Sequence, residues 1–135
     1  MDQHKIELEH FYPHPVSNVW DAISKQEAIS AWFIQADFQA EEGYGYTFTH
    51  EQTTITGTVL KASPPSELTY TWVVGGVETT VSWMLSAQEN GTLLKLIHTG
   101  IEKYGESAAV MFGNFEGGWN NCIAELESYL IPQNV

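Results

Sequence analysis

Alternating apolar and polar residues run through most of the first hundred positions and predict a series of β-strands, each with one buried face. The first such segment is Lys5 to Tyr12, and the later ones extend from about Gly45 to His98. Three turn sequences separate the later segments: Pro64-Pro65, Gly75-Gly76 and Asn90-Gly91. Because turns rather than helices join these strands, the pattern predicts an antiparallel meander of about six to seven strands.

Helical spacing of apolar residues occurs on both sides of the meander. Two short segments after the first strand, with Ser17 as the expected N-cap of the first and about Glu27 to Phe33 as the second, predict two short helices. An unbroken 3.6-residue period then predicts one continuous or mildly kinked helix from Ser107 to Leu130, which Pro132 would end. The side chains expected to face the sheet are Phe112, Phe115 and Trp119. We therefore expect an α+β fold in which a curved antiparallel sheet surrounds a long C-terminal helix.

Three glycines interrupt the predicted C-terminal helix, namely Gly113, Gly117 and Gly118. Each costs roughly 0.5–1 kcal/mol relative to alanine, so their presence needs a reason. One explanation is close contact of the helix backbone with the sheet, or a mild kink. The other is a lowered local stability that lets a pocket open. Close contact is the explanation that we favour.

Length and charge narrow the class of protein. The 135 residues predict a single domain over residues 1–135. The net charge is −12, and all five basic residues are dispersed lysines, so we expect neither nucleic acid nor an anionic membrane as a partner. Without arginine there is no bidentate clamp for phosphate or carboxylate, so a bound small molecule would not be held by an anionic group. A single cysteine, a polar N-terminus and no long apolar run favour a cytoplasmic protein.

Residues that could carry chemistry are scattered along the chain. The histidines are His4, His10, His14, His50 and His98. They lack the spacing of known zinc sites, so we expect no metal and no cofactor, and interpret His98 as a hydrogen-bonded buried residue. Cys122 has no basic neighbour on its helix and is interpreted as an inert buried thiol. A carboxylate of Glu51, Glu78 or Glu116 could act as a general base if it were buried in a cavity. Acidic side chains usually lie on the solvent-exposed surface, so we assign no catalytic residue.

Aromatic and sulfur-containing residues are the remaining candidates for a binding site. Bulky rings between a curved sheet and a helix with three glycines pack imperfectly, which predicts an apolar cavity of a few hundred cubic ångströms, at the lower end of about 300–1,000 Å³. The candidate ligand-binding residues are Trp32, Phe33, Phe48, Tyr70, Trp72, Trp83, His98, Met111, Phe112, Phe115 and Trp119. Polar groups within this cavity would come from Tyr70, His98, Thr79 and Thr99.

A set of short motifs, in order along nearly the whole chain, resembles the family named after the heat-shock-protein-90 ATPase activator. The matching segments are Val19-Trp20-Asp21-Ala22-Ile23, Ala31-Trp32-Phe33, Gly57-Thr58-Val59-Leu60 with Pro64-Pro65, Leu68-Thr69-Tyr70-Thr71-Trp72, Gly91-Thr92, Leu96-Ile97-His98-Thr99-Gly100, and Gly118-Trp119 leading into Leu126 and Tyr129-Leu130. The resemblance implies the helix-grip fold shared with START, birch-pollen-allergen and polyketide-cyclase proteins. The co-chaperones of the family carry an additional N-terminal module, and we expect none here, as in the stand-alone bacterial members.

Three functions remain open at this point. The leading hypothesis is binding of a small neutral hydrophobic molecule (lipid-like, flavonoid-like or polyketide-like) between the sheet and the C-terminal helix. The second is a protein-interaction role, co-chaperone-like or in stress response, which would give the chain a protein partner. The third is a cyclase- or hydrolase-like enzyme that uses the same cavity. The sequence leaves the oligomeric state open.

Overall fold

Seven antiparallel strands form one sheet in a computed structural model of the protein, which describes residues 5–50 and 53–130 except for the side chain of His50. Their order across the sheet is β1-β7-β6-β5-β4-β3-β2. The strands are β1 (Ile6–Tyr12), β2 (Gln35–Asp37), β3 (Gly45–His50), β4 (Thr53–Ser63), β5 (Glu67–Val74), β6 (Val77–Gln88) and β7 (Gly91–Thr99). The predicted meander is confirmed. The three-residue strand β2 is too short to leave an alternating pattern in the sequence.

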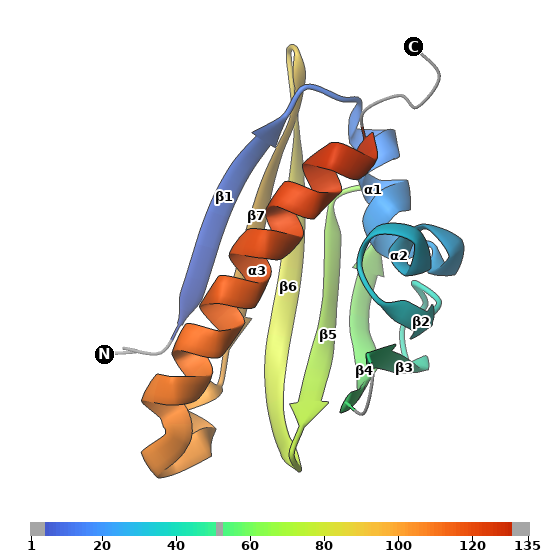
Figure 1. Ribbon diagram of the computed structural model, residues 1–135. Coiled ribbons are helices and arrows are strands. Elements are labelled where there is room, and N and C mark those ends of the chain that lie inside the picture. The colour runs from blue at the N-terminus through green and yellow to red at the C-terminus, as the bar shows by residue number, and fades with distance from the viewer. Residues whose placement is uncertain (1–4, 51–52, 131–135) are drawn as a thin grey trace.

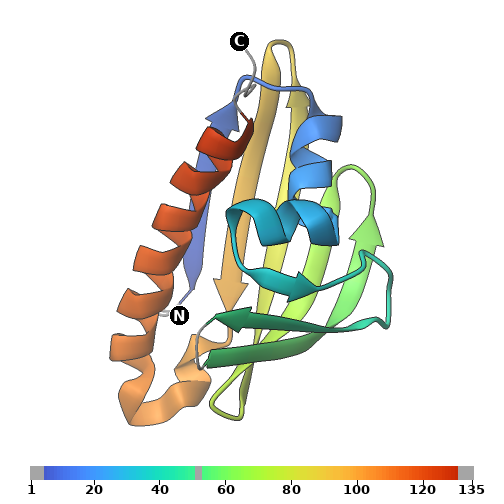
Figure 2. The same cartoon turned by 45° about the vertical axis from the view of Figure 1, so that its right-hand side comes forward.

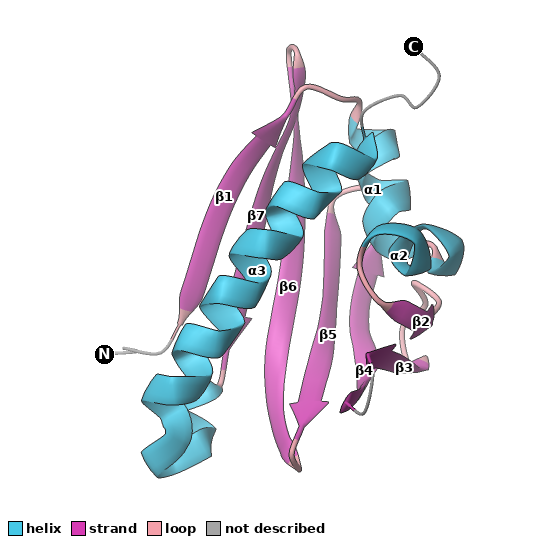
Figure 3. Ribbon diagram, viewed as in Figure 1, coloured by secondary structure: helices cyan, strands magenta, loops and turns pink. Residues whose placement is uncertain are grey.

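The helices described by the structure lie on one face of the sheet (Figures 1 and 3). They are α1 (Val16–Ser24), α2 (Gln26–Trp32), the 3₁₀ helix η1 (Ile101–Ser107) and α3 (Ala108–Leu130). The long helix α3 runs diagonally across the sheet as one continuous element, and α1 and α2 lie beside it over the same face (Figure 2). This is the expected helix-grip arrangement. Ser17 is not the N-cap of α1, because Pro15 occupies that position with a φ of −57° and the helix begins at Val16.

Strict alternation of burial along the strands builds the core. On β7 the four inward-facing residues are fully buried, and they alternate with partly exposed neighbours. The inward-facing residues of this strand are Thr92, Leu94, Leu96 and His98. Val81, Trp83 and Leu85 continue the same surface on β6, since register pairs Trp83 with Leu96 and Leu85 with Leu94. The sheet thus presents an apolar face to the helices.

The two predicted glycine hairpins differ in what their glycines do. At the β5–β6 turn, Gly75 and Gly76 adopt positive φ angles of 63° and 80°, as expected of a two-residue turn. At the β6–β7 turn, Gln88 pairs with Gly91, so Gly91 belongs to the strand and not to the turn. A Cβ at this position would lie 2.2 Å from the backbone oxygen of Tyr12 on β1. Close approach of a neighbouring strand, and not turn geometry, therefore requires glycine at Gly91.

The glycines of α3 have the opposite surroundings. A Cβ placed on Gly113, Gly117 or Gly118 would meet no atom within 4 Å, apart from the helix's own nearby backbone. The expectation of close contact between the helix backbone and the sheet is therefore wrong, because these positions border open space. The continuous helix also gives no sign of a break at them.

These contrasting surroundings predict opposite effects of the same substitution. Gly91→Ala should lower the free energy of unfolding by about 1–3 kcal/mol, because its methyl group overlaps the β1 backbone. Gly113→Ala should raise it by about 0.5–1 kcal/mol, because it improves helix propensity without a clash. Urea unfolding of the two variants and the wild type measures both changes. A Gly91→Ala variant as stable as the wild type would contradict the close approach of β1.

Candidate functional site

A buried chain of hydrogen bonds connects α3 to the centre of the sheet. The indole Nε1 of Trp119 donates to Nδ1 of His98 at 2.9 Å, and Nε2 of His98 lies 2.7 Å from Oγ1 of Thr79. Oγ1 of Thr79 in turn donates to the backbone oxygen of Trp72 at 3.0 Å. An indole nitrogen can only donate, so Nδ1 of His98 accepts and its proton resides on Nε2. The hydrogen bonds thus all point in one direction, from α3 through β7 and β6 to β5.

His98 is consequently a structural residue. Both of its ring nitrogens have partners, and its side chain is fully buried. Burial disfavours the charged ring and lowers the pKa of His98 to about 4, so the ring is neutral near pH 7. The interpretation of His98 as a hydrogen-bonded buried histidine is confirmed. No ring nitrogen is left to accept a proton from a bound molecule.

Dense aromatic contacts fill the space around these hydrogen bonds. Nε1 of Trp83 donates to the hydroxyl of Tyr70 at 2.7 Å, and the rings of Phe48 and Trp72 meet edge to face at 5.9 Å. Four of the candidate ligand-binding residues are core residues: Phe48, Tyr70, Trp83 and His98. They line neither of two pockets that lie beside α3 and are described next. Met111 and Phe112 are half-buried near the start of α3 and line neither pocket.

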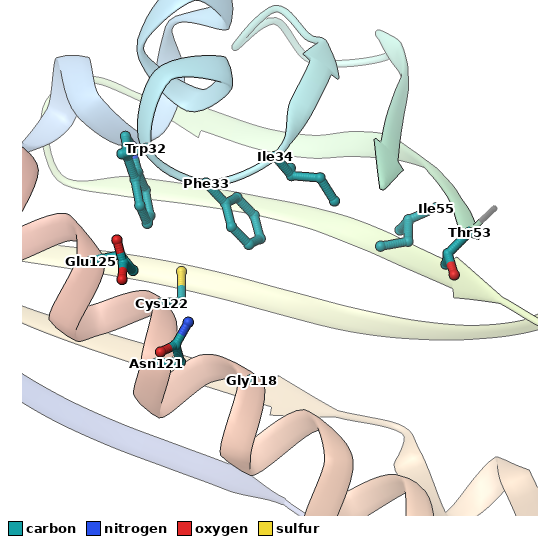
Figure 4. Close-up of a pocket in the computed structure, with 9 residues that line it drawn as sticks. All are labelled: Trp32, Phe33, Ile34, Thr53, Ile55, Gly118, Asn121, Cys122 and Glu125. Atoms are coloured by element: carbon teal, nitrogen blue, oxygen red, sulfur yellow. The ribbon is translucent and has the colours of Figure 1, made fainter. Parts of the chain in front are cut away.

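A pocket of about 330 Å³ opens to one side of this core, between α3, the end of α2 and strand β4. Figure 4 shows the side chains of Trp32 and Phe33 above the helix, with the sulfur of Cys122 directed toward them. The residues that line the pocket, called here the wide pocket, are Trp32, Phe33, Ile34, Thr53, Ile55, Gly118, Asn121, Cys122 and Glu125. The wall formed by α2 and β4 is mainly apolar, and the polar side chains come chiefly from α3.

A second, narrower pocket of about 110 Å³ adjoins the first. Its lining residues are Phe33, Trp72, Asn114, Phe115, Gly118 and Trp119, and it is called here the narrow pocket. Phe33 and Gly118 line both pockets, so the two spaces meet at these residues. The structure thus brings five of the candidate residues to a pocket wall: Trp32, Phe33, Trp72, Phe115 and Trp119.

Sequence reasoning missed the other wall residues. The missed residues are Ile34, Thr53, Ile55, Asn114, Gly118, Asn121, Cys122 and Glu125. A signal existed for Gly118, because a glycine inside a strong helical period indicates either a close contact or an empty space, and the structure shows empty space. No local signal marks Asn121 or Glu125, since their place on the wall depends on how α3 crosses the sheet.

Among the described residues, the titratable side chains near the pockets do not form an acid–base pair. Cys122 is buried, and this burial raises the pKa of its thiol, as expected of an unreactive group. Glu125 is an exposed residue of the wide pocket, and Glu78 and Glu116 are exposed elsewhere. Glu51 and His4 lie outside the described residues. Within residues 5–50 and 53–130, no group of three or more histidine, cysteine or acidic residues could hold a metal ion.

A third hollow of about 470 Å³ lies between the α1–α2 junction and residues 38–40. Its lining residues are Ser24, Lys25, Gln26, Glu27, Phe38, Gln39 and Ala40, and most of them are exposed. One of its polar groups is already used, since the side-chain oxygen of Gln26 accepts a hydrogen bond from the Phe38 amide at 3.1 Å. This hollow therefore has the character of ordinary polar surface.

Comparison with known proteins agrees with the fold described above. Residues 13–131 match the model of the family described as "Activator of Hsp90 ATPase homolog 1-like protein". The chain belongs to this family. Its fold is one that generally binds small ligands. No protein with a curated description matches the chain. Across the described residues, none of the helices has both the length and the apolar character needed to cross a bilayer.

Solved structures give the same architecture. Protein MLL2253 from Mesorhizobium loti is similar with a TM-score of 0.89 at 21% identity, covering 97% of this chain and 99% of that one. Bacillus halodurans protein BH1534 has a TM-score of 0.80 at 27% identity, with 93% and 96% covered. CalU16 from Micromonospora echinospora has a TM-score of 0.78 at 29% identity, with 96% of this chain and 77% of that chain covered.

The neutral state of His98 predicts a specific loss of stability in acid. Its pKa is about 4 in the folded protein and about 6.5 in the unfolded chain, so the unfolded chain binds more protons between these values. The contribution of His98 is therefore fully present above about pH 6.5 and falls as the pH decreases toward 4. Its size is on the order of 3 kcal/mol. Urea unfolding at a series of pH values from 7 to 4 measures this loss.

The control is His98→Gln, whose side chain does not titrate. This variant should be less stable than the wild type at pH 7, and the stability difference should shrink as the pH falls, because only the wild type loses the His98 contribution. The comparison also cancels the titration of surface carboxylates, which both proteins share. A stability difference that stays constant across this pH range would contradict a buried neutral histidine.

Proposed function

We propose that this protein binds a small, neutral, hydrophobic molecule without covalent chemistry in the wide and narrow pockets beside α3. The observation that carries the proposal is the wide pocket itself, about 330 Å³ with an apolar wall, continued by the smaller apolar space next to Trp72. Pockets that hold small molecules have volumes of about 300–1,000 Å³ and mainly apolar walls with a few polar groups. Both spaces together reach the lower part of that range.

A flat ligand suits these walls. The rings of Trp32 and Phe33 are stacked at 5.2 Å with an angle of 24° between them, and both border the wide pocket. Aromatic surfaces of this kind favour a planar partner that stacks or meets them edge to face. Flavonoid-like and polyketide-like molecules fit this description better than a long flexible lipid, because ordering a flexible chain carries a larger entropic cost.

Charge supports a neutral ligand. Among the residues that the structure describes, Glu125 is the one charged residue on either pocket wall, and no lysine lines them. An anion would lose hydration without gaining a cationic partner, in a protein whose net charge of −12 repels it. The enzyme hypothesis gains no support from the described residues, because His98 is fully hydrogen-bonded and Glu78 and Glu116 are exposed.

A matched pair of fluorescent probes tests the proposal. N-phenyl-1-naphthylamine is neutral, and 8-anilinonaphthalene-1-sulfonate has the same skeleton with an added sulfonate. The neutral probe should quench tryptophan fluorescence and raise the melting temperature. At a concentration of a hundred times its Kd it should add about 2.7 kcal/mol to the free energy of unfolding. The sulfonate should do neither at the same concentration. Failure of the neutral probe and of a broad panel of neutral apolar compounds to bind would refute the proposal.

Two substitutions at adjacent glycines locate the binding. Leucine at Gly118 would fill space shared by both pockets, whereas Gly117 is also open but lines neither of them. Gly118→Leu should reduce the affinity for N-phenyl-1-naphthylamine at least tenfold, because its side chain occupies the ligand's volume. Gly117→Leu makes the same chemical change on the same helix and should bind like the wild type. Equal affinities in the two variants would show that the probe binds elsewhere.

A further inference from the structure

We infer that the ligand carries a neutral hydrogen-bond acceptor, such as a carbonyl or ether oxygen, which enters the narrow pocket and accepts a hydrogen bond from Nε1 of Trp72. This inference rests on the proposed function and adds to it the chemical class of the ligand. It begins from a polar atom of the protein that has no partner.

The indole of Trp72 differs from those of Trp32, Trp83 and Trp119 in lacking a hydrogen-bond partner. Its residue is only 5% exposed, and its Nε1 is buried with no hydrogen-bond partner. Three other tryptophans donate to a protein acceptor: Trp32 to the Ala22 oxygen at 2.7 Å, Trp83 to the Tyr70 hydroxyl at 2.7 Å and Trp119 to His98 at 2.9 Å. Buried polar groups without a partner are rare in native proteins, so the Trp72 donor requires an explanation.

Nearby polar groups of the protein are already engaged. The ring of His98 lies 6.3 Å from that of Trp72, and both of its nitrogens are used in the buried chain. The Thr79 hydroxyl belongs to the same chain and donates to the backbone oxygen of Trp72. The rings of Phe48 and Trp119 offer no acceptor atom, and the Tyr70 hydroxyl, on a ring 6.4 Å away, already accepts from Trp83. The described protein groups therefore leave this donor without an acceptor.

Trp72 lines the narrow pocket, so a bound molecule can supply the acceptor; because Nε1 itself is buried, the indole ring must turn toward the pocket for the bond to form. Phe33, Phe115 and Trp119 form most of the remaining wall of this pocket. An indole N–H only donates, so it selects an acceptor atom and cannot satisfy a hydroxyl that must donate. A carboxylate or phosphate would also accept, but no described lysine lines the pocket to balance its charge. A neutral acceptor atom can accept from the indole N–H and needs no cationic side chain to balance a charge.

Two probes of nearly equal size test the inference. 2-Acetylnaphthalene carries a carbonyl oxygen, and 2-ethylnaphthalene has the same ring without an acceptor. Their dissociation constants are measured by tryptophan fluorescence on the wild type and on Trp72→Phe, which removes the N–H and keeps an aromatic ring. Trp20→Phe is the matched control, because Trp20 is also a buried tryptophan but lines neither pocket. Indole ¹⁵N–¹H spectra of the wild type, with the Trp72 signal assigned, follow the donor directly.

The wild type should bind the ketone roughly threefold to tenfold more tightly than the hydrocarbon, the worth of one ordinary hydrogen bond. The Trp72 indole signal should move downfield with the ketone only. The preference should disappear in Trp72→Phe and persist in Trp20→Phe. If Trp72→Phe does not fold, the wild-type spectra alone decide.

Three results would overturn the inference in distinguishable ways. Equal affinity for both probes, with an unmoved Trp72 signal, would reject the acceptor and leave the proposed function intact. A Trp72 N–H that contacts an ordered water in the free protein, and still does so with the ketone bound, would show that water is the partner. Failure of both probes, together with N-phenyl-1-naphthylamine, to bind the wild type would reject the acceptor and the proposed function together.

Discussion

The structure depends on a polar connection through an apolar interior, the hydrogen-bond chain from Trp119 through His98 and Thr79 to the Trp72 carbonyl. A helix held to a sheet by apolar contact alone can slide or rotate with little cost, since the hydrophobic effect is not directional. A buried series of donors and acceptors has one satisfied arrangement, and a slip of α3 would leave the Trp119 N–H and Nδ1 of His98 unpaired. The chain therefore fixes the rotation of α3, and with it which residues of the helix face the pockets.

The location of the pockets follows from the dimensions of the elements. Seven strands spaced by about 4.8 Å span roughly 29 Å, whereas one helix with its side chains is about 10–12 Å across. Helix α3 lies toward the β1 side and contacts that strand, where the Tyr12 hydroxyl donates to the Ile123 oxygen at 3.0 Å (Figure 1). The short helices cover a further part of the face. What remains between α3 and β4 is bridged by the side chains of Trp32 and Phe33, which do not fill it.

Local patterns were sufficient to predict the elements, and insufficient where three-dimensional neighbours decide. Alternation from Leu68 to Trp72 predicts an inward face whichever strands lie beside it, and the 3.6-residue period of α3 survives its glycines. Gly91 was assigned to a turn because nothing in its own sequence shows that the β1 backbone passes 2.2 Å from a Cβ there. The partition of the aromatic residues between core and pocket wall was equally hidden, since Trp83 and Trp72 both lie on alternating strands, yet only Trp72 lines one of the two pockets.

The pairing of β1 with β7 has a consequence for how the chain acquires its structure during synthesis. Ile6 pairs with His98, so β1 leaves the ribosome roughly ninety residues before its partner strand β7. During that interval an apolar strand edge is available for incorrect association. The outward positions of β1 carry Glu7 and Glu9, and these charges oppose pairing with another chain of the same kind. In the folded sheet Glu7 lies opposite Ile97 and Glu9 lies opposite Lys95, and Glu7 forms an ion pair with Lys95 at 2.7 Å. The carboxylates that oppose incorrect pairing of the nascent strand therefore face β7 lysine and backbone neighbours once β1 is paired.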